Sequence, residues 1–382
     1  MTRKLAFAAL LLAALIFSFA GLAQAAPAHE VVFKVGRGYY VTDGGQNWMD
    51  AVTFVENNRT YVPVRYLAYA LGVNEEGVKY DNGTVTLALN GKTITMTEGS
   101  KALKVDNSVT NMDVAPIIKD GRTYLPARWV AEAFGYKVDW FDPIQWVLIR
   151  DQATWKAAQP KFLNGPVDKD GYQYPNITAV AFGAQSNTVT AYRGDPIGWD
   201  VVQRDNRKVD FPYAKWDVTL PGPVAVKMDP ITDPVSGEVF QYNVEVNIKN
   251  LLLAFGVPEG AIHWDEETQT LLVECDYIYR VDSPLQDRFT VQYIWMRPGE
   301  NVFYNHFTDI PDQVRHIEYS SEDSYGKYKP EYPGAKFSYD PQNGFVGTGF
   351  AKYLPAYVYH NEMNGLGIRA YGWQGLHVIS IG

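Results

Sequence analysis

The sequence predicts an α+β fold built from repeated units, each a mostly antiparallel β-sheet packed on one short α-helix. Two observations lead to this prediction. Segment Met49–Gly72 recurs at Met112–Gly135, at a constant offset and without a gap, which indicates a duplicated structural unit. Within each copy, β-rich stretches and turn signals flank a short apolar stripe that has helical spacing.

Each copy begins with a predicted β-hairpin. Residues 52–55 and 60–62 are rich in β-branched and aromatic side chains, and Glu56–Arg59 form the turn between them. The corresponding turn of the second copy is Lys119–Arg122. Further strands are expected within 78–96 and 137–150, where Asp81-Asn82-Gly83, Asn90-Gly91 and Asp142-Pro143 are turn signals.

A short helix is expected after each hairpin. Pro63 and Pro126 are placed in its first turn, where a missing N–H costs nothing. Gly72 and Gly135 are placed as C-terminal caps with positive φ. The apolar stripe, at i, i+3, i+4 and i+7, consists of Val64, Leu67, Ala68 and Leu71 in the first copy and of Ala127, Val130, Ala131 and Phe134 in the second.

The stripe recurs in the second half of the chain. It is found again, with the same internal spacing, at Ile248, Leu251, Leu252 and Phe255, and Asn247 replaces the proline as a residue suited to a helix start. A fourth copy is expected at the end, where 353–356 repeats the Tyr-Leu-Pro-Ala of 124–127 and 376–381 is a closing strand. Chance similarity between β-rich segments is the alternative for both.

Four segments are predicted along the chain. They are a signal peptide at 1–25, a first domain at 31–152 with half-repeats at about 31–90 and 91–151, a linker at 153–170, and a second α+β region at 171–382. The signal rests on Arg3-Lys4, an apolar run and small residues before the cut. An uncleaved anchor is the alternative; after cleavage no transmembrane helix is expected. The second region is interpreted as a diverged copy of the repeat, with helices near 248–255 and 356–363.

Charge and cysteine content narrow the class of protein. The formal charge is −9, and −11 without Arg3 and Lys4, which argues against nucleic acid and anionic membrane surfaces as partners. Cys275 is the only cysteine, so no internal disulfide is expected. It lies in an apolar strand-like run, which favours a buried inert thiol over a reactive one.

The segment "MDVAPIIKDGRTYLPARWVAEAFGYKVDW", followed by "VLI", resembles the copper amine oxidase N-terminal-like domain, a stalk module of exported bacterial proteins. The resemblance covers roughly 31–151 as two half-repeats. It implies a small sheet wrapped around a helix outside the cell, attached to other modules. It does not imply amine oxidation, because the Asn-Tyr-Asp/Glu-Tyr and His-x-His motifs of the catalytic domain are absent from the sequence. No catalytic residue, metal ligand or cofactor is therefore assigned.

Four arginines flank the strand and helix start of the two copies: Arg59, Arg65, Arg122 and Arg128. Arginine forks match carboxylates and phosphates, so these side chains could bind an anion. The favoured interpretation is structural: they pair with Asp50 and Asp113 or with turn carbonyls, because they recur with the fold unit.

Aromatic side chains are the second candidate binding feature. Tyr66, Tyr69 and Trp129 lie off the apolar stripes, so they are either exposed platforms for sugars or proteins, or a second buried layer. Residues 320–345 alternate Tyr and Phe with Gly, Pro and charges, and are interpreted as a long loop or insertion where binding could occur.

Titratable residues give no recognisable active site. The histidines are His29, His263, His306, His316, His360 and His377, without metal-ligand spacing. His263 next to Trp264-Asp265 is interpreted as part of a solvated turn. The Asp-rich stretches at Asp168 and Asp229 lack calcium-loop spacing and are interpreted as ordinary turns.

The sequence therefore predicts a non-enzymatic, secreted or cell-surface protein of the cell envelope, acting as a stalk-like binding, spacer or assembly module. A cell-wall polymer or another envelope protein is the expected partner. Two alternatives stay open. One is a secreted hydrolase or oxidase with a site in the second half, and the other is a self-assembling surface-layer or filament subunit.

Overall fold

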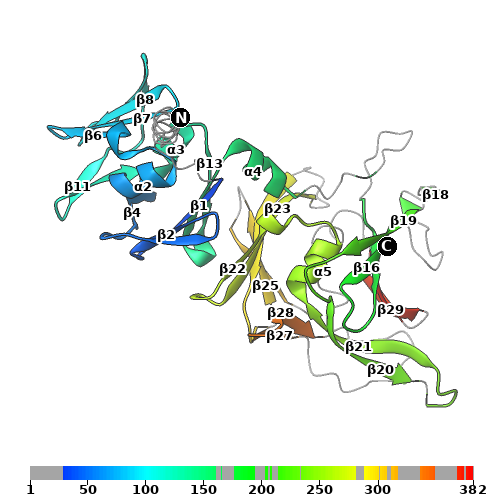
Figure 1. Cartoon of the computed structure of the whole chain (residues 1–382). Coiled ribbons are helices and arrows are strands. Elements are labelled where there is room, and N and C mark those ends of the chain that lie inside the picture. The colour runs from blue at the N-terminus through cyan, green and yellow to red at the C-terminus, as the bar shows by residue number, and fades with distance from the viewer. Residues whose placement is uncertain are drawn as a thin grey trace, which may run out of the picture. The chain divides into compact units, whose positions relative to one another are not determined.

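A computed structural model describes residues 29–160, 165, 176–193, 203–204, 207–208, 214–232, 234–280, 288–300, 302–307, 311–316, 336–348, 368–373 and 376–381 (Figure 1). The chain divides into two compact units, Met1–Trp155 and Lys156–Gly382. Mostly antiparallel β-sheet with a few short helices makes up both units, which agrees with the predicted α+β class. None of the helices described is long and apolar enough to cross a membrane.

Unit 1 contains three antiparallel sheets. The first has the order β13 (Lys137–Phe141), β14 (Trp146–Arg150), β1 (Glu30–Lys34), β2 (Tyr39–Thr42), β3 (Gly45–Trp48). The second has the order β10 (Ser108–Asn111), β9 (Ala102–Val105), β8 (Lys92–Thr97), β7 (Thr84–Leu89), β6 (Val78–Asp81). The third has the order β11 (Ile117–Lys119), β12 (Arg122–Pro126), β5 (Arg59–Pro63), β4 (Phe54–Glu56).

Both five-stranded sheets of unit 1 contain strands from both predicted half-repeats. The predicted boundary near residue 90 falls between β7 and β8, yet these two strands pair along their length. At the other end of the unit, β14 pairs with β1, so the last strand completes the sheet of the first. The sequence prediction gave each half its own sheet and helix. The structure instead interleaves the halves, because each sheet is completed by strands from the other half.

The two helices of unit 1 that carry the apolar stripes begin and end almost where the stripes predict. They are α2 (Val64–Ala70) and α3 (Ala127–Ala133). Pro63 and Pro126 are the N-caps and the last residues of β5 and β12, one position before the predicted first turn. Gly72 and Gly135 have φ of 86° and 95°, the left-handed conformation that ends a helix.

A single hydrophobic core holds unit 1 together. The side chains of Leu67, Leu71, Val130 and Ala131 from the two helices join residues of all three sheets in one buried cluster. Figure 1 shows α2 and α3 side by side, with β6–β8 on one side and β1 and β2 on the other. Burial of this apolar surface from both directions is the main stabilising contribution expected for a domain without a disulfide.

The described part of unit 2 contains three sheets of four or five strands and a separate two-stranded hairpin of β17 (Gln203–Arg204) and β18 (Arg207–Lys208). One sheet has the order β19 (Ala214–Thr219), β16 (Thr188–Arg193), β15 (Ala179–Phe182), β30 (Leu376–Ile381), β29 (Ile368–Trp373). Another has the order β22 (Ile262–Asp265), β23 (Thr270–Arg280), β24 (Arg288–Met296), β25 (Val302–Phe307), β26 (Gln313–His316). The third has the order β20 (Ala225–Thr232), β21 (Val239–Asn247), β28 (Gly344–Thr348), β27 (Lys336–Asp340).

These orders follow the same path as those of unit 1. Strands β15, β16 and β19 correspond to β1, β2 and β3. From β20 to β30, each strand of unit 2 then has the same place in its sheet as the corresponding strand, β4 to β14, of unit 1. Helix α5 (Ile248–Ala254) follows β21 as α2 follows β5. The short 3-10 helices η1 (Glu75–Gly77) and η3 (Glu259–Ala261) occupy corresponding places before β6 and β22, whereas η2 (Asp142–Ile144) follows β13. The predicted stripe of α5 is buried, and the Asn247 side chain accepts a hydrogen bond from the Asn250 N–H as the N-cap.

Three sequence predictions need correction. The predicted linker at 153–170 begins inside a helix, α4 (Gln152–Ala158). The predicted loop at 320–345 ends in strands, because β27 and the start of β28 fall within it. The stretch that begins at Asp229 starts inside β20, where the Asp229 carboxylate pairs with Lys227 at 2.6 Å, and its turn comes only at 234–236. The signal peptide at 1–25, the helix near 356–363, Asp168 and His360 lie outside the described residues.

Candidate binding site

Two ion pairs join the halves of unit 1. Arg122 Nη2 lies 2.8 Å from Asp50 Oδ2, and Arg59 Nε lies 2.6 Å from Asp113 Oδ2. The two pairs occupy equivalent positions in the repeat. In each pair, the arginine of one half binds the aspartate of the other half. Arg59 also donates to the carbonyl of Asn58 at 2.7 Å. These contacts agree with the favoured interpretation that the two arginines pair with the aspartates and with a turn carbonyl. Each ion pair, however, joins one half of unit 1 to the other and does not lie within one half.

Two aromatic side chains complete the same contacts. The Tyr66 hydroxyl donates to Asp50 Oδ1 at 2.8 Å, and Trp129 Nε1 donates to Asp113 Oδ1 at 2.8 Å. Hydrogen bonds from Arg122 and Tyr66 lower the pKa of Asp50 to about 2. The hydrogen bond from Trp129 lowers the pKa of Asp113. Both aromatic rings are half-buried against the core, so each combines the two predicted roles, with an apolar face inside and a polar edge at the surface.

A hollow of about 400 Å³ lies beside α3 in unit 1. Its walls are the β4–β5 hairpin, helix α3, and strand β13 with the turn that follows. The residues that line it are Val55, Asn58, Arg59, Thr60, Asp113, Pro126, Ala127, Arg128, Trp129, Glu132, Val138, Asp139, Trp140, Asp142, Gln145 and Val147. The hollow therefore includes one of the two ion pairs and two tryptophans.

The two tryptophans are fixed in place. Trp129 is held by its hydrogen bond to Asp113, and Trp140 lies in β13 opposite Val147 of β14. Both rings are half-buried and pack against the core of unit 1. A ring that is already immobilised loses little side-chain entropy when a ligand covers its free face, which favours binding.

Polar groups surround the tryptophans. Arg128 and Glu132 are exposed on α3. Gln145, in the left-handed conformation at φ 53°, donates to the Asp142 carbonyl at 2.8 Å and to its carboxylate at 3.0 Å. Asp139 accepts a hydrogen bond at 2.8 Å from Arg150, so its carboxylate is held in place. The rim thus offers hydrogen-bond donors and acceptors, of which Asp139, Asp142 and Gln145 are held in place.

Only part of this site could be predicted from the sequence. Of the four candidate arginines, Arg59 and Arg128 line the hollow, whereas Arg65 and Arg122 are not among its lining residues. Trp129 was a candidate, and Trp140 was not. Its signal was present in the repeat, because the first strand after α2, α3 and α5 carries an aromatic residue at the third or fourth position each time.

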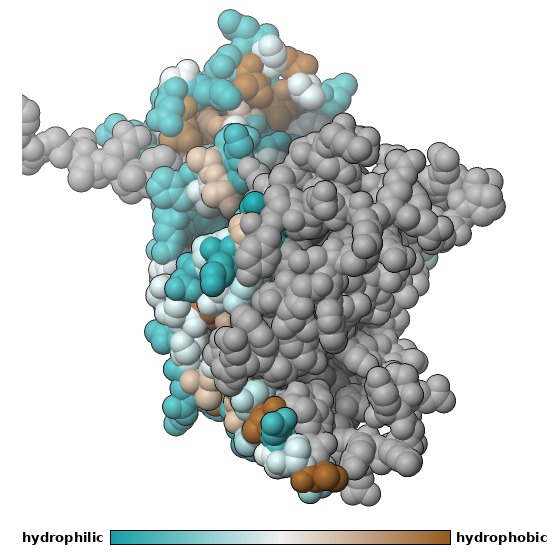
Figure 2. Space-filling view, turned by 90° about the vertical axis from the view of Figure 1, so that its right-hand side faces the viewer, coloured by the Kyte–Doolittle hydropathy of each residue, from teal (hydrophilic) through white to brown (hydrophobic). Residues whose placement is uncertain are grey.

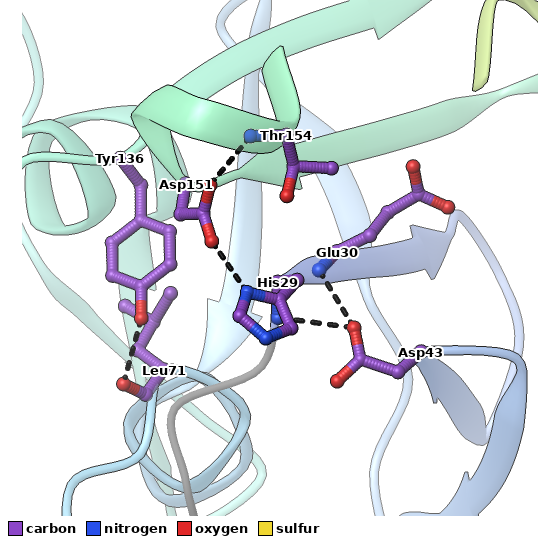
Figure 3. Close-up of polar contacts among 7 residues, drawn as sticks. All are labelled: His29, Glu30, Asp43, Leu71, Tyr136, Asp151 and Thr154. Atoms are coloured by element: carbon purple, nitrogen blue, oxygen red, sulfur yellow. Dashed lines mark hydrogen bonds and ion pairs between the residues drawn. The ribbon is translucent and has the colours of Figure 1, made fainter. Parts of the chain in front are cut away.

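His29 connects the start of unit 1 to its end (Figure 3). Its Nδ1 lies 2.6 Å from Asp151 Oδ2, and the hydrogen bond raises the pKa of His29 above 6.5. Asp151 Oδ1 accepts from the Thr154 N–H at 2.7 Å, while Asp43 accepts from the backbone of His29 and Glu30. These contacts close the unit and give His29 a structural role.

The prediction of a solvated turn around His263 is wrong. His263 and Asp265 are 7% and 1% exposed, and His263 Nε2 lies 2.7 Å from Glu274 Oε1. Asp265 accepts hydrogen bonds from the backbone N–H and the hydroxyl of Thr268, so a buried carboxylate holds the turn together. His306 Nδ1 lies 2.8 Å from Asp312 at a partly exposed position.

Across the described residues no three or more His, Cys, Asp and Glu side chains gather as a metal site would require. His316 and His377 are on strands β26 and β30. Cys275 is half-buried beside the core of unit 2 rather than fully buried, and its thiol lies 3.6 Å from the Val273 carbonyl.

The surface is mixed in character. Figure 2 shows one face, on which the hydrophobic residues of the described part form separate patches among hydrophilic ones. The most exposed large apolar side chains of unit 1 include Trp48 on β3 and Val109 on β10, at 75% and 64% exposure. Both are on edge strands, at the end of their respective sheets.

The fold defines unit 1 as a small α+β module, with two short helices, α2 and α3, enclosed by three antiparallel sheets. Residues 41–149 match the family model described as copper amine oxidase N-terminal domain. This part of the chain is therefore a copper amine oxidase N-terminal domain, as the sequence resemblance predicted. The match lies within unit 1 and does not include a catalytic domain. No curated protein and no solved structure matches the chain.

Proposed function

We propose that the chain is a non-enzymatic, exported protein of the cell envelope that acts as a stalk-like binding and spacer module, with two domains of the same kind in tandem. The observation that carries the proposal is the strand order of unit 2, which follows that of unit 1 sheet by sheet. A copper amine oxidase N-terminal domain forms most of unit 1, so unit 2 is proposed as a diverged second copy. Tandem modules with separate cores are suited to spacing and presenting a binding surface.

The same reasoning applies inside unit 1. Strands β2, β3, β4 and β5 and helix α2 recur as β9, β10, β11, β12 and α3, all at the same offset along the chain. Val62 and Leu125, which are equivalent residues of β5 and β12, pair with each other, so the two copies meet at this point. A duplication of half a domain, followed by a duplication of the whole domain, accounts for these spacings.

A binding role is favoured over catalysis by the state of the charged groups in the hollow. Asp113 has a lowered pKa and is ionised at neutral pH, which makes it a poor proton donor. Asp139 is held by Arg150, and Asp142 by Gln145. Carboxylates that are held in place are suited to accept hydrogen bonds from a ligand.

Export is proposed from the sequence of the first 25 residues, whose basic start, apolar run and small residues are typical of a signal peptide. The partner is proposed to be a cell-wall polymer or another envelope protein.

Fractionation of native cells, together with a pull-down on purified peptidoglycan, tests this role. We expect the full-length mature protein in the envelope fraction and on the peptidoglycan pellet. Recovery only in the culture medium, without binding to any envelope fraction, would identify a free secreted factor and refute the proposal.

Self-assembly is a second candidate function. Edge strands β3 and β10 present side chains that are largely exposed, and an open edge can pair with the edge of another chain. Sedimentation of the purified protein at increasing concentration tests this alternative. Concentration-dependent growth beyond a monomer supports assembly, and a constant monomer mass excludes it.

A further inference from the structure

One aromatic position recurs after three helices. Tyr80, Trp140 and Trp264 lie in β6, β13 and β22, the first strand after α2, α3 and α5. In each case the residue opposite on the neighbouring strand is buried in the core. Those opposite residues are Val85, Val147 and Leu271. The three aromatic rings therefore occupy equivalent places in the fold.

A second set of equivalent positions lies in the hairpins of the four-stranded sheets. Val55, Ile118 and Tyr339 are each the penultimate residue of β4, β11 and β27, the outer strands of their hairpins. Each pairs with a residue of the second strand near the turn, and the second strands β5, β12 and β28 are the inner strands of their four-stranded sheets.

In unit 2 the hairpin residue covers the aromatic ring. Tyr339 and Trp264 stack with ring centroids 4.6 Å apart and planes inclined by 7°. In unit 1 the residue that faces the same hollow as Trp140 is Val55. Valine has no ring that could stack on Trp140, and the two side chains line the hollow together. Of the three equivalent positions, the one at Trp264 is thus covered by a second ring, whereas the hairpin residue near Trp140 is a valine.

We propose that a sugar ring of a cell-wall polysaccharide binds in this hollow and stacks on Trp140. This deepens the binding role proposed above and rests on it. A pyranose ring has a flat face of C–H groups that packs on an aromatic ring through dispersion, while its hydroxyl groups point outward. The hollow, at about 400 Å³, lies within the range of small-ligand sites.

The rim favours a sugar over an aromatic side chain of a partner protein. Nine of the sixteen lining residues are polar or charged, and they surround the tryptophans. Asp142 and Glu132 accept hydrogen bonds, Arg128 donates them, and an amide such as Asn58 does both. Sugar hydroxyls can satisfy all of these groups, whereas an apolar ring would desolvate them without compensation.

Isothermal titration calorimetry on the full-length mature protein tests the proposal, with a tetrasaccharide of N-acetylglucosamine and solubilised peptidoglycan glycan as probes. We expect Trp140→Ala to weaken binding about tenfold or more, because a stacking platform is lost. Val55→Tyr should weaken it to a similar degree by placing a ring over Trp140, as in unit 2. Trp48→Ala removes an exposed tryptophan outside the hollow and should leave binding unchanged.

Thermal unfolding of each variant establishes that it folds; because Val55→Tyr adds a ring contact, it should be at least as stable as the parent. Wild-type affinity in folded Trp140→Ala or Val55→Tyr overturns the proposal. Binding of a tryptophan-containing peptide, but of neither glycan, overturns the sugar assignment. Undiminished pull-down of Trp140→Ala on peptidoglycan refutes this site while leaving the envelope role intact. Failure of the wild type in pull-down and fractionation refutes the envelope role itself.

Discussion

Leu67 and Leu251 test whether the chain consists of two independent cores. They hold the same position, the fourth residue, in α2 and α5, and both side chains are 0% exposed. Leu67 belongs to the core of unit 1 and Leu251 to the core of unit 2, and the two clusters share no residue. Replacing a buried leucine by alanine costs roughly 2–5 kcal/mol, with the value set by how far the cavity collapses.

We expect each substitution to destabilise only the unit that contains it. For a unit of this size, a loss of about 3 kcal/mol lowers Tm by roughly 6–12 °C. Differential scanning calorimetry measures the transitions, and hydrogen exchange with mass spectrometry assigns each to a unit. Val109→Ala, on the exposed edge strand β10, serves as the control and should change stability by less than about 0.5 kcal/mol. Equal loss of protection in both units after Leu67→Ala would show a single cooperative core and refute the reasoning.

Three further predictions concern individual contacts. The lowered pKa of Asp50, about 2, means that its contribution to stability is present above its unfolded pKa near 3.8 and is lost as the pH falls towards 2. The Tm difference between wild type and Asp50→Asn should therefore shrink between pH 5 and pH 2 (about the interval in which both forms titrate), and a constant difference would contradict this. The raised pKa of His29 means that its contribution is present below pH 6.5 and is lost as the pH rises through the raised value. Asp151→Asn, which keeps an acceptor for the helix cap, should return the NMR titration midpoint of His29 towards 6.5; an unchanged midpoint would exclude this ion pair. Tyr339→Val should remove about 0.5–1.5 kcal/mol of stacking from unit 2, in addition to the buried area, and leave the calorimetric transition of unit 1 in place.

Local features of the fold could be predicted from the sequence because neighbouring residues determine them. The helices follow from apolar spacing, and Asn247 caps the start of α5 because its amide side chain can accept from a free backbone N–H. Asn57 and Asn58 have φ of 51° and 58°, as a two-residue hairpin turn requires. Pairing across the halves, such as Val31 of β1 with Ile149 of β14, could not be predicted, because many β-rich strands of similar pattern could be partners.

In the candidate site, too, some features could be predicted from the sequence and others could not. The repeat indicated that Arg59 and Arg122 serve the fold, and their ion pairs agree with that interpretation. It could not indicate that each binds the aspartate of the other half, since the constant offset between the copies fits pairing within a half or across halves equally well. The hollow beside Trp140 is made by a hairpin and a strand that lie far apart in the sequence, so no local pattern marks it.

A comparison of equivalent positions in the two halves of unit 1 shows which side chains the fold requires and which can vary. Asp50 and Asp113 recur with their arginine and aromatic partners, because these contacts join the two halves. The position of Tyr69 in α2 is taken by Glu132 in α3, although the two helices have the same length and the same place. The fold therefore does not require either side chain there. A carboxylate at this position adds a hydrogen-bond acceptor to the wall of the hollow, which the proposed ligand could use without any change to the fold.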